Sequence, residues 1–361
     1  MTHCVRSRIA WVDIAKGIGI CLVALGHTEW LSPDAKKFVY TFHMPLFYFL
    51  SGLFFDSKRK RSFREIAFGQ SGLLVAWAFF VLVSILRFPI EPQLLPINRR
   101  DLAFKVWSFV HGAPFTNLPL WFLVSLTFVI VCFSALFHRV GGFRSAYARM
   151  IFLSICAVCM ACASLLPVLF AKNCPFMLTT MPAGLFWYAS GAFSRRRVLA
   201  WMANSAPVAL ILLGVLAAFV LVAGLAPVEA SSVYSMRIRS WRFLPLSLVG
   251  IAMTICFAGG CSRALAKPLS FIGRHSLTFF SLDYVVRPYV KQLLLSFLPV
   301  ELNSIFLLFA YILLHLSVVS LLCIPTEFLL LRFRRAAEQF WRFGSKDSSP
   351  RNSLATNKDI C

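Results

Sequence analysis

Long apolar stretches recur along the whole chain and are separated by short segments that carry charge, proline or glycine. A helix that crosses a bilayer needs about 20 predominantly apolar residues. Ten stretches come close to that length: 9–27, 38–56, 66–86, 119–137, 150–170, 176–193, 206–226, 242–260, 276–298 and 302–324. The pattern therefore predicts an all-α, polytopic integral membrane protein with ten transmembrane helices.

The first of these stretches is unusually polar for a membrane helix. It contains Asp13, Lys16 and His27, and its only uninterrupted apolar run, 17–26, is too short to span a bilayer alone. An ionisable group at the centre of a membrane helix costs about 2.5–3.5 kcal/mol or more, so such groups are rarely without a function. Either the stretch does not cross the membrane well, or it is a membrane helix whose polar residues have a chemical function.

Composition agrees with a membrane protein and argues against two soluble domains. The 361 residues are 59% hydrophobic and only 14% charged, and the apolar runs cover nearly the whole length. We expect a single membrane domain over residues 1–335. Residues 336–361 end in a stretch rich in Ser, Asn and Lys, which predicts a disordered cytoplasmic tail.

The distribution of Lys and Arg predicts the orientation in the membrane. With the N-terminus placed in the cytoplasm, 23 of the 36 basic residues fall on inner segments and 10 on outer segments. This asymmetry predicts an inner-membrane protein with both termini in the cytoplasm. It also explains most of the net charge of +22 by topology and attraction to membrane lipids, without a nucleic-acid partner.

Two histidines are the first candidates for catalysis. His27 lies 11 residues after Lys16, about 16 Å along a helix, so the two residues belong near opposite membrane faces. A short loop to the next helix would bring His43 to a similar depth. A neutral imidazole can take a proton from a hydroxyl near pH 7. Alternatively, His27 is a helix-end histidine at the membrane interface, and His43 is a packing or kink residue. Asp13 is expected to be a structural partner of Lys16 at the i, i+3 spacing.

Other charged groups have both structural and functional interpretations. The run 58–64 includes Arg59, Arg61 and Arg64, which could bind the phosphates of an anionic cytoplasmic cofactor or only anchor the chain on the inner side. Asp283 lies four residues before Arg287, and structural pairing of the two is the favoured interpretation.

Several motifs of other function classes are missing. The sequence has no G-x-x-x-x-G-K-[ST] motif for an ATP-driven pump, no H-E-x-x-H zinc motif and no H-x-x-x-x-D acyltransferase motif. Cys156, Cys159 and Cys162 form overlapping C-x-x-C spacings, but their apolar neighbours favour an ordinary membrane helix over a metal site. We expect no metal ion.

Five stretches of the chain resemble the acyltransferase-3 family of integral membrane O-acyltransferases. They are Trp11-Val12-Asp13-Ile14-Ala15-Lys16-Gly17 running to Gly26-His27, Phe42-His43-Met44-Pro45-Leu46-Phe47, Phe49-Leu50-Ser51-Gly52, Leu120-Trp121-Phe122-Leu123 and Gly273-Arg274-His275-Ser276-Leu277. The first two motifs together are specific, and the pattern covers nearly the whole chain. Ten helices are the architecture of this family.

The resemblance implies a reaction and a set of residues. Its functional signature, a basic residue about ten positions before a histidine, maps onto Lys16 and His27. Members commonly move an acetyl group from cytoplasmic acetyl-CoA to a sugar hydroxyl of a surface or secreted glycan. For this chain the resemblance implies a bacterial inner-membrane O-acetyltransferase of the xanthan type. Relatives often carry a histidine where this chain has Asp283.

These observations lead to the hypothesis of acetylation of an exopolysaccharide repeat unit, with mannose as one candidate acceptor. His27 and His43 would be catalytic, and His27 would deprotonate the hydroxyl or carry the acetyl group itself. Lys16 and the basic run would bind acetyl-CoA. The expected partners are a lipid-linked or nascent polysaccharide and other polysaccharide assembly proteins. A transporter or flippase of a lipid-linked glycan is the main alternative, and a scaffold for a synthase complex is another.

Overall fold

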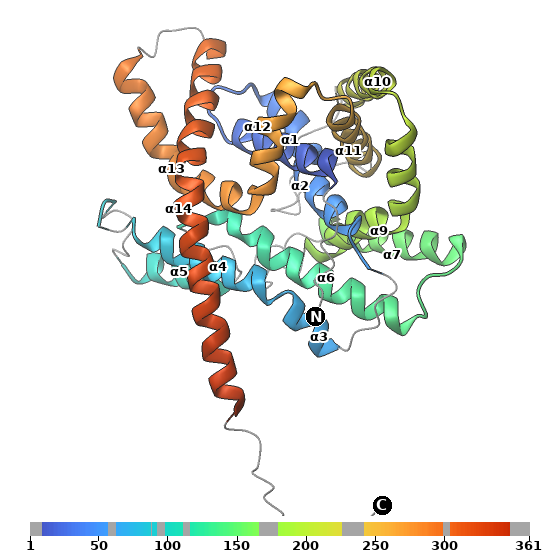
Figure 1. Cartoon of the computed structure of the whole chain (residues 1–361), viewed down its shortest axis with the longest axis horizontal. Coiled ribbons are helices and arrows are strands. Elements are labelled where there is room, and N and C mark those ends of the chain that lie inside the picture. Colours follow the sequence, from blue (N-terminus) through green and yellow to red (C-terminus); the bar gives the residue numbers. More distant parts are fainter. Residues whose placement is uncertain are drawn as a thin grey trace, which may run out of the picture.

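The computed structural model describes residues 9–56, 63–87, 89–91, 98–110, 116–165, 180–225, 242–298 and 304–346. Within these residues all regular structure is helical (Figure 1). The helices are α1 (Ala10–Gly26), α2 (Pro33–Gly52), α3 (Phe63–Gly69), α4 (Ser71–Ile85), α5 (Arg99–Val110), the 3-10 helix η2 (Leu118–Leu120), α6 (Trp121–Arg139), α7 (Ala146–Leu165), α9 (Met181–Asn204), α10 (Pro207–Leu225), α11 (Phe243–Gly259), α12 (Arg263–Arg274), α13 (Ser276–Phe297) and α14 (Ser304–Lys346). The predicted all-α fold is confirmed, and each of the ten predicted spans contains helix.

Three described stretches are long and apolar enough to cross a membrane by length and composition alone. They are Leu118–Arg139, Pro207–Gly224 and Ser304–Gln339. Ser71–Ile85, Ala146–Cys162 and Phe243–Gly259 are apolar but shorter. Large apolar side chains such as Leu212, Phe219 and Leu313 are well exposed on α10 and α14, as expected of helix faces that contact lipid.

The structure differs from the predicted elements in four places. Helix α5 lies between the predicted spans 66–86 and 119–137, where no helix was expected. The predicted span 66–86 is two helices, α3 and α4, which meet at Gln70. The connection between α11 and α13 contains a further helix, α12, which hydropathy misses because it is short and carries Arg263, Lys267 and Arg274. Helix α14 continues to Lys346, so the prediction of a disordered tail from residue 336 is wrong for its first part. Residues 347–361 lie outside the described part.

Helix α1 lies at the centre of the packing and contacts α2, α11, α12, α13 and α14. Two glycines allow α1 and α12 to cross closely (Figure 1): a Cβ on Gly17 would overlap the backbone oxygen of Leu269, and one on Gly273 would overlap that of Asp13. Small residues permit such backbone contact between membrane helices. The crossing therefore explains both motif glycines and fixes the helix that carries Lys16 and His27.

A second pair of glycines brings α2 and α9 together. A Cβ on Gly52 would overlap the backbone oxygen of Tyr188, and one on Gly191 would overlap that of Phe49. Helix α2 begins with Ser32, whose hydroxyl accepts a hydrogen bond from the Ala35 backbone N–H, and with a proline at the first helical position. These contacts place α2 between α1 and α9.

Candidate active site

The two predicted catalytic histidines line one cavity of about 320 Å³ at the C-terminal end of α1. We call it the histidine cavity. Its wall is formed by His27, Tyr40, His43, Met44, Leu118, Pro119, Trp121, Phe280, Tyr284 and Arg287. The short connection between α1 and α2 places both imidazoles on the same side of the molecule. The structure thus brings together His27 and His43 from separate helices.

Each histidine uses one ring nitrogen to bond its own helix. Nδ1 of His27 lies 2.8 Å from the Val23 carbonyl oxygen, and Nδ1 of His43 lies 2.9 Å from that of Val39. A carbonyl oxygen only accepts hydrogen bonds, so Nδ1 carries the hydrogen in both rings. In the neutral imidazoles the lone pair is then on Nε2, where it can accept a proton from a substrate.

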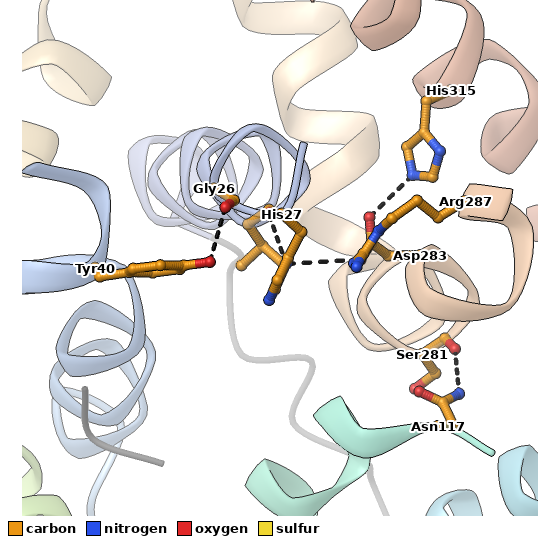
Figure 2. A network of polar contacts seen from close by, with 9 residues as sticks. Gly26, His27, Tyr40, Asn117, Ser281, Asp283, Arg287 and His315 are labelled. Carbon is orange, nitrogen blue, oxygen red and sulfur yellow. Dashed lines mark hydrogen bonds and ion pairs between the residues drawn. The ribbon is translucent and has the colours of Figure 1, made fainter. Parts of the chain in front are cut away.

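Asp283 on α13 lies between His27, which follows α1, and His315 on α14 (Figure 2). Its carboxylate lies 3.9 Å from His27 Nδ1 and 3.0 Å from His315 Nε2, and it pairs with Arg287 one turn later on α13. The Asp283 side chain is only 4% exposed. The predicted pairing of Asp283 with Arg287 is confirmed, while the contacts of Asp283 with two histidines were not foreseen.

Tyr40 holds the two histidine-bearing helices in register. Its hydroxyl donates a 2.7 Å hydrogen bond to the Gly26 carbonyl oxygen at the end of α1 (Figure 2). Its ring centroid lies 6.1 Å from that of His27 and 5.3 Å from that of His43. The aromatic ring and the hydrogen bond together fix the distance between the two imidazoles.

The wall opposite the histidines is fixed by a buried amide. The Asn117 side chain donates hydrogen bonds to the Ser281 carbonyl oxygen at 2.7 Å and to the Ser84 hydroxyl at 3.2 Å. These bonds tie the start of η2 to α13 and α4. Trp121, which follows η2, is thereby held as an aromatic face of the histidine cavity.

Lys16 lies at the other end of the site, in a separate pocket of about 190 Å³. We call this the lysine pocket; Ser51, Phe122, Ser276 and Phe280 also line it. Phe280 belongs to the walls of both cavities, and its ring centroid lies 5.6 Å from that of Phe122. One buried phenylalanine therefore stands between the space at Lys16 and the space at His27.

The other predicted residues have different positions. The described contacts contain no ion pair between Asp13 and Lys16; the Lys16 ammonium instead lies 5.8 Å from the centre of the Phe54 ring. The backbone of Asp13 meets Gly273 at the crossing with α12. Arg59 and Arg61 lie outside the described residues. Arg64 is in α3, and its side chain is also outside the described part.

Three of the described side chains could together bind a metal ion. Atoms of His275, Cys323 and Glu327 lie within 4.8 Å of one another between α13 and α14. The Glu327 carboxylate already pairs with His275 Nδ1 at 2.6 Å and accepts a hydrogen bond from the Thr278 hydroxyl at 3.1 Å. Both bonds go to Oε1 of Glu327, so the cluster links α14 to the start of α13.

Sequence reasoning missed Tyr40, Tyr284 and His315. His315 stands in the apolar run of the last predicted span and is 1% exposed. An ionisable residue at membrane depth is itself a functional signal, so His315 could have been noticed. The two tyrosines carry no such signal, because tyrosine is common in membrane helices near the interface.

Comparison with known proteins gives one result that covers the site. A family model described as an acyltransferase domain, that of acyltransferase-3, matches residues 9–324 and therefore includes both histidines, Lys16 and Asp283. The curated proteins and the solved structures give no match. An all-helical chain with several apolar spans and with this match over most of its length is a multi-pass membrane acyltransferase, and it belongs to the acyltransferase-3 family.

Proposed function

We propose that this acyltransferase moves an acetyl group from cytoplasmic acetyl-CoA to a sugar hydroxyl of a bacterial exopolysaccharide repeat unit. The acetyl donor enters from the Lys16 end of α1, and the sugar binds in the histidine cavity. The inner membrane, with both termini in the cytoplasm, is the proposed location. The lipid-linked or nascent polysaccharide is the proposed partner, together with other polysaccharide assembly proteins.

The observation that carries the proposal is the hydrogen bonding of His27. Because Nδ1 is held by the Val23 carbonyl, Nε2 is the free base. It takes the proton of the sugar hydroxyl as the hydroxyl oxygen bonds to the thioester carbonyl carbon. The C–S bond then breaks, and the imidazolium returns the proton to the departing thiolate of CoA. The Asp283 carboxylate, 3.9 Å from Nδ1, stabilises the imidazolium that forms between these steps.

The composition of the histidine cavity supports a sugar as acceptor. Its volume of about 320 Å³ lies within the range of about 300–1,000 Å³ that is common for small-molecule sites. The aromatic rings of Trp121 and Tyr284 provide flat apolar walls, while His43, Arg287 and Tyr40 provide polar groups. A hexose such as mannose has both apolar faces and hydroxyls, and it fits this mixture.

The lysine pocket supports a donor that arrives from the opposite end. The pocket is small, about 190 Å³, and has Lys16 and two serine hydroxyls beside several phenylalanines. A pantetheine arm is thin and has amide groups between methylene groups, so it suits such a lining. The thioester would pass Phe280 to reach His27. The acetyl donor would therefore reach His27 from the lysine pocket and the sugar from the histidine cavity, so the two substrates stay apart until transfer.

The test is acetyl transfer by purified protein in lipid nanodiscs, followed as release of free CoA thiol in the presence of a mannose-containing lipid-linked oligosaccharide. His27→Ala should lower the rate by about 10²–10⁴-fold, the usual contribution of a general base. His138→Ala removes a histidine from the last turn of α6, outside the cavity, and serves as the matched control. A stably inserted His27→Ala protein with full transfer would refute the proposal.

The same assay separates the enzyme from a transporter or flippase. A flippase moves the glycan without consuming acetyl-CoA, so no thiol release would depend on the acceptor. NMR of the secreted polysaccharide, with and without the gene, identifies the acetylated sugar. Loss of O-acetyl signals on one sugar residue is the expected result.

A further inference from the structure

A large cavity rich in arginine lies near the C-terminal ends of α2 and α6. We call it the arginine cavity. It measures about 750 Å³, and its wall includes Arg149, Arg195, Arg196, Arg197, Phe55 and Asp56. Arginine stays charged at all physiological pH values. Four guanidinium groups beside one carboxylate make this cavity strongly positive.

Backbone contacts orient two of the four guanidinium groups. Arg149 Nε donates a 2.9 Å hydrogen bond to the Phe143 carbonyl oxygen, and Arg195 Nη1 donates one of 2.9 Å to that of Phe55. Arg196 and Arg197 follow on α9 and are exposed. Half of the cluster is therefore fixed by the fold, while the other half is accessible to a ligand.

The close crossing of α2 and α9 places this cavity and the lysine pocket beside the same short segment of chain. Gly52 and Gly191 let the two backbones touch, which brings the part of α9 that carries Arg195 beside the segment that follows α2. In this segment Phe55 lines the arginine cavity, and its neighbour Phe54 lies under the Lys16 ammonium. Ser51, slightly earlier in the chain, lines the lysine pocket. One short stretch of chain thus borders both spaces.

We propose that the arginine cavity binds the ribose phosphate and the diphosphate of the CoA donor. The pantetheine arm then runs past Phe54 into the lysine pocket. Arginine forms bidentate hydrogen bonds with phosphate oxygens, and the cavity volume is large enough for a nucleotide. This inference rests on the proposed function and names the residues that bind its donor. It places the phosphates on α7 and α9, outside the basic run that contains Arg59 and Arg61.

The headgroup of an anionic lipid offers the same phosphate chemistry, so the experiment must separate the two sources. Full-length protein in phosphatidylcholine nanodiscs, which contain no anionic lipid, is titrated with CoA, dephospho-CoA and pantetheine by calorimetry. The variant Arg196→Gln/Arg197→Gln removes the two exposed charges. The variant Arg263→Gln/Lys267→Gln removes two exposed charges from α12, away from the cavity, as the matched control.

We expect Arg196→Gln/Arg197→Gln to weaken CoA binding by about tenfold or more, because the two substitutions remove charge-assisted hydrogen bonds to phosphate oxygens. Dephospho-CoA should lose less, pantetheine should be unaffected, and the control should bind CoA normally. The variant Arg196→Lys/Arg197→Lys, which keeps both positive charges, should bind CoA more tightly than the glutamine variant. Unchanged CoA affinity, or an equal loss for CoA and pantetheine, would overturn the proposal; the equal loss would indicate a lipid-binding or structural role.

The outcome is distinguishable from failure of the proposed function. If the wild-type protein binds CoA through these arginines but transfers no acetyl group to any sugar, the proposed function fails and the phosphate site stands. If acetyl transfer is confirmed while Arg196→Gln/Arg197→Gln keeps full CoA affinity, the phosphate site is wrong and the proposed function stands.

Discussion

The crossing of α1 and α12 offers a prediction that can be worked out from the contacts alone. In Gly273→Ala the new Cβ would overlap the backbone oxygen of Asp13, and the backbone nitrogen of Gly17 would lie only 2.9 Å away. Both neighbours are main-chain atoms, so no side chain can turn aside to make room. The two helices would have to move apart, and α1 carries Lys16 and leads directly into His27.

The magnitude follows from two opposing effects. Overpacking in a tight interior costs about 1–3 kcal/mol, and a clash with backbone on both sides belongs at the upper end. Alanine in a helix recovers about 0.5–1 kcal/mol relative to glycine. Gly72 in α4 provides the control, because a Cβ there meets nothing within 4 Å. Gly72→Ala should therefore be neutral or stabilising. Because the gain from alanine is common to both variants, they should differ by the cost of the clash, about 2–3 kcal/mol.

The assay is reversible unfolding of the two purified variants in the same detergent, with acetyl transfer measured in parallel. We expect Gly273→Ala to unfold at a lower temperature than wild type and to transfer more slowly, because the displaced α1 moves His27 away from Asp283. Equal stability of Gly273→Ala and Gly72→Ala would refute the close crossing of α1 and α12.

Two further predictions concern α13. Asp283→Asn or Arg287→Gln alone should lower the free energy of unfolding by about 3–5 kcal/mol, because each leaves one charge of the buried pair without the other. The double variant should recover part of this loss. Strictly additive losses in a double-mutant cycle would contradict the pairing. Phe280→Leu should raise hydrolysis of acetyl-CoA in the absence of a sugar, measured by thiol release, because a smaller side chain between the two pockets admits water to the thioester. A hydrolysis rate equal to wild type would argue against Phe280 as a barrier.

The sequence predicted those parts of the fold and site that depend on local patterns. Apolar length located the ten helical spans, and the short loop after His27 predicted that it would lie near His43. Helix α12 escaped because hydropathy cannot separate a short amphipathic helix from a polar connection. The break at Gln70 was missed although Gly69-Gln70-Ser71-Gly72 marks it, because the apolar residues that follow dominate the average hydropathy of the span.

The contacts of Asp283 show why the rest of the site could not be predicted. Its pairing with Arg287 follows from their spacing on one helix, and the sequence was sufficient for it. Its contacts with His27 and His315 join three helices that are far apart in the chain. They depend on where α13 lies relative to α1 and α14, and that position is set by close crossings such as the one at Gly273.

The arrangement of the α9 arginines also could not be predicted from the sequence. Along the chain, Arg195, Arg196 and Arg197 are explained fully by the tendency of basic residues to stay on the cytoplasmic side. That tendency requires only that the residues be basic and near a helix end, and lysines at the same positions would satisfy it equally. It does not require that Arg149, from another helix, face the same cavity, or that backbone carbonyls hold two of the four side chains. Membrane topology alone does not require four arginines from two helices to line one cavity, so this arrangement is better evidence for a ligand than the basic residues themselves. The glutamine and lysine variants of Arg196 and Arg197 test whether the cavity needs arginine or only positive charge.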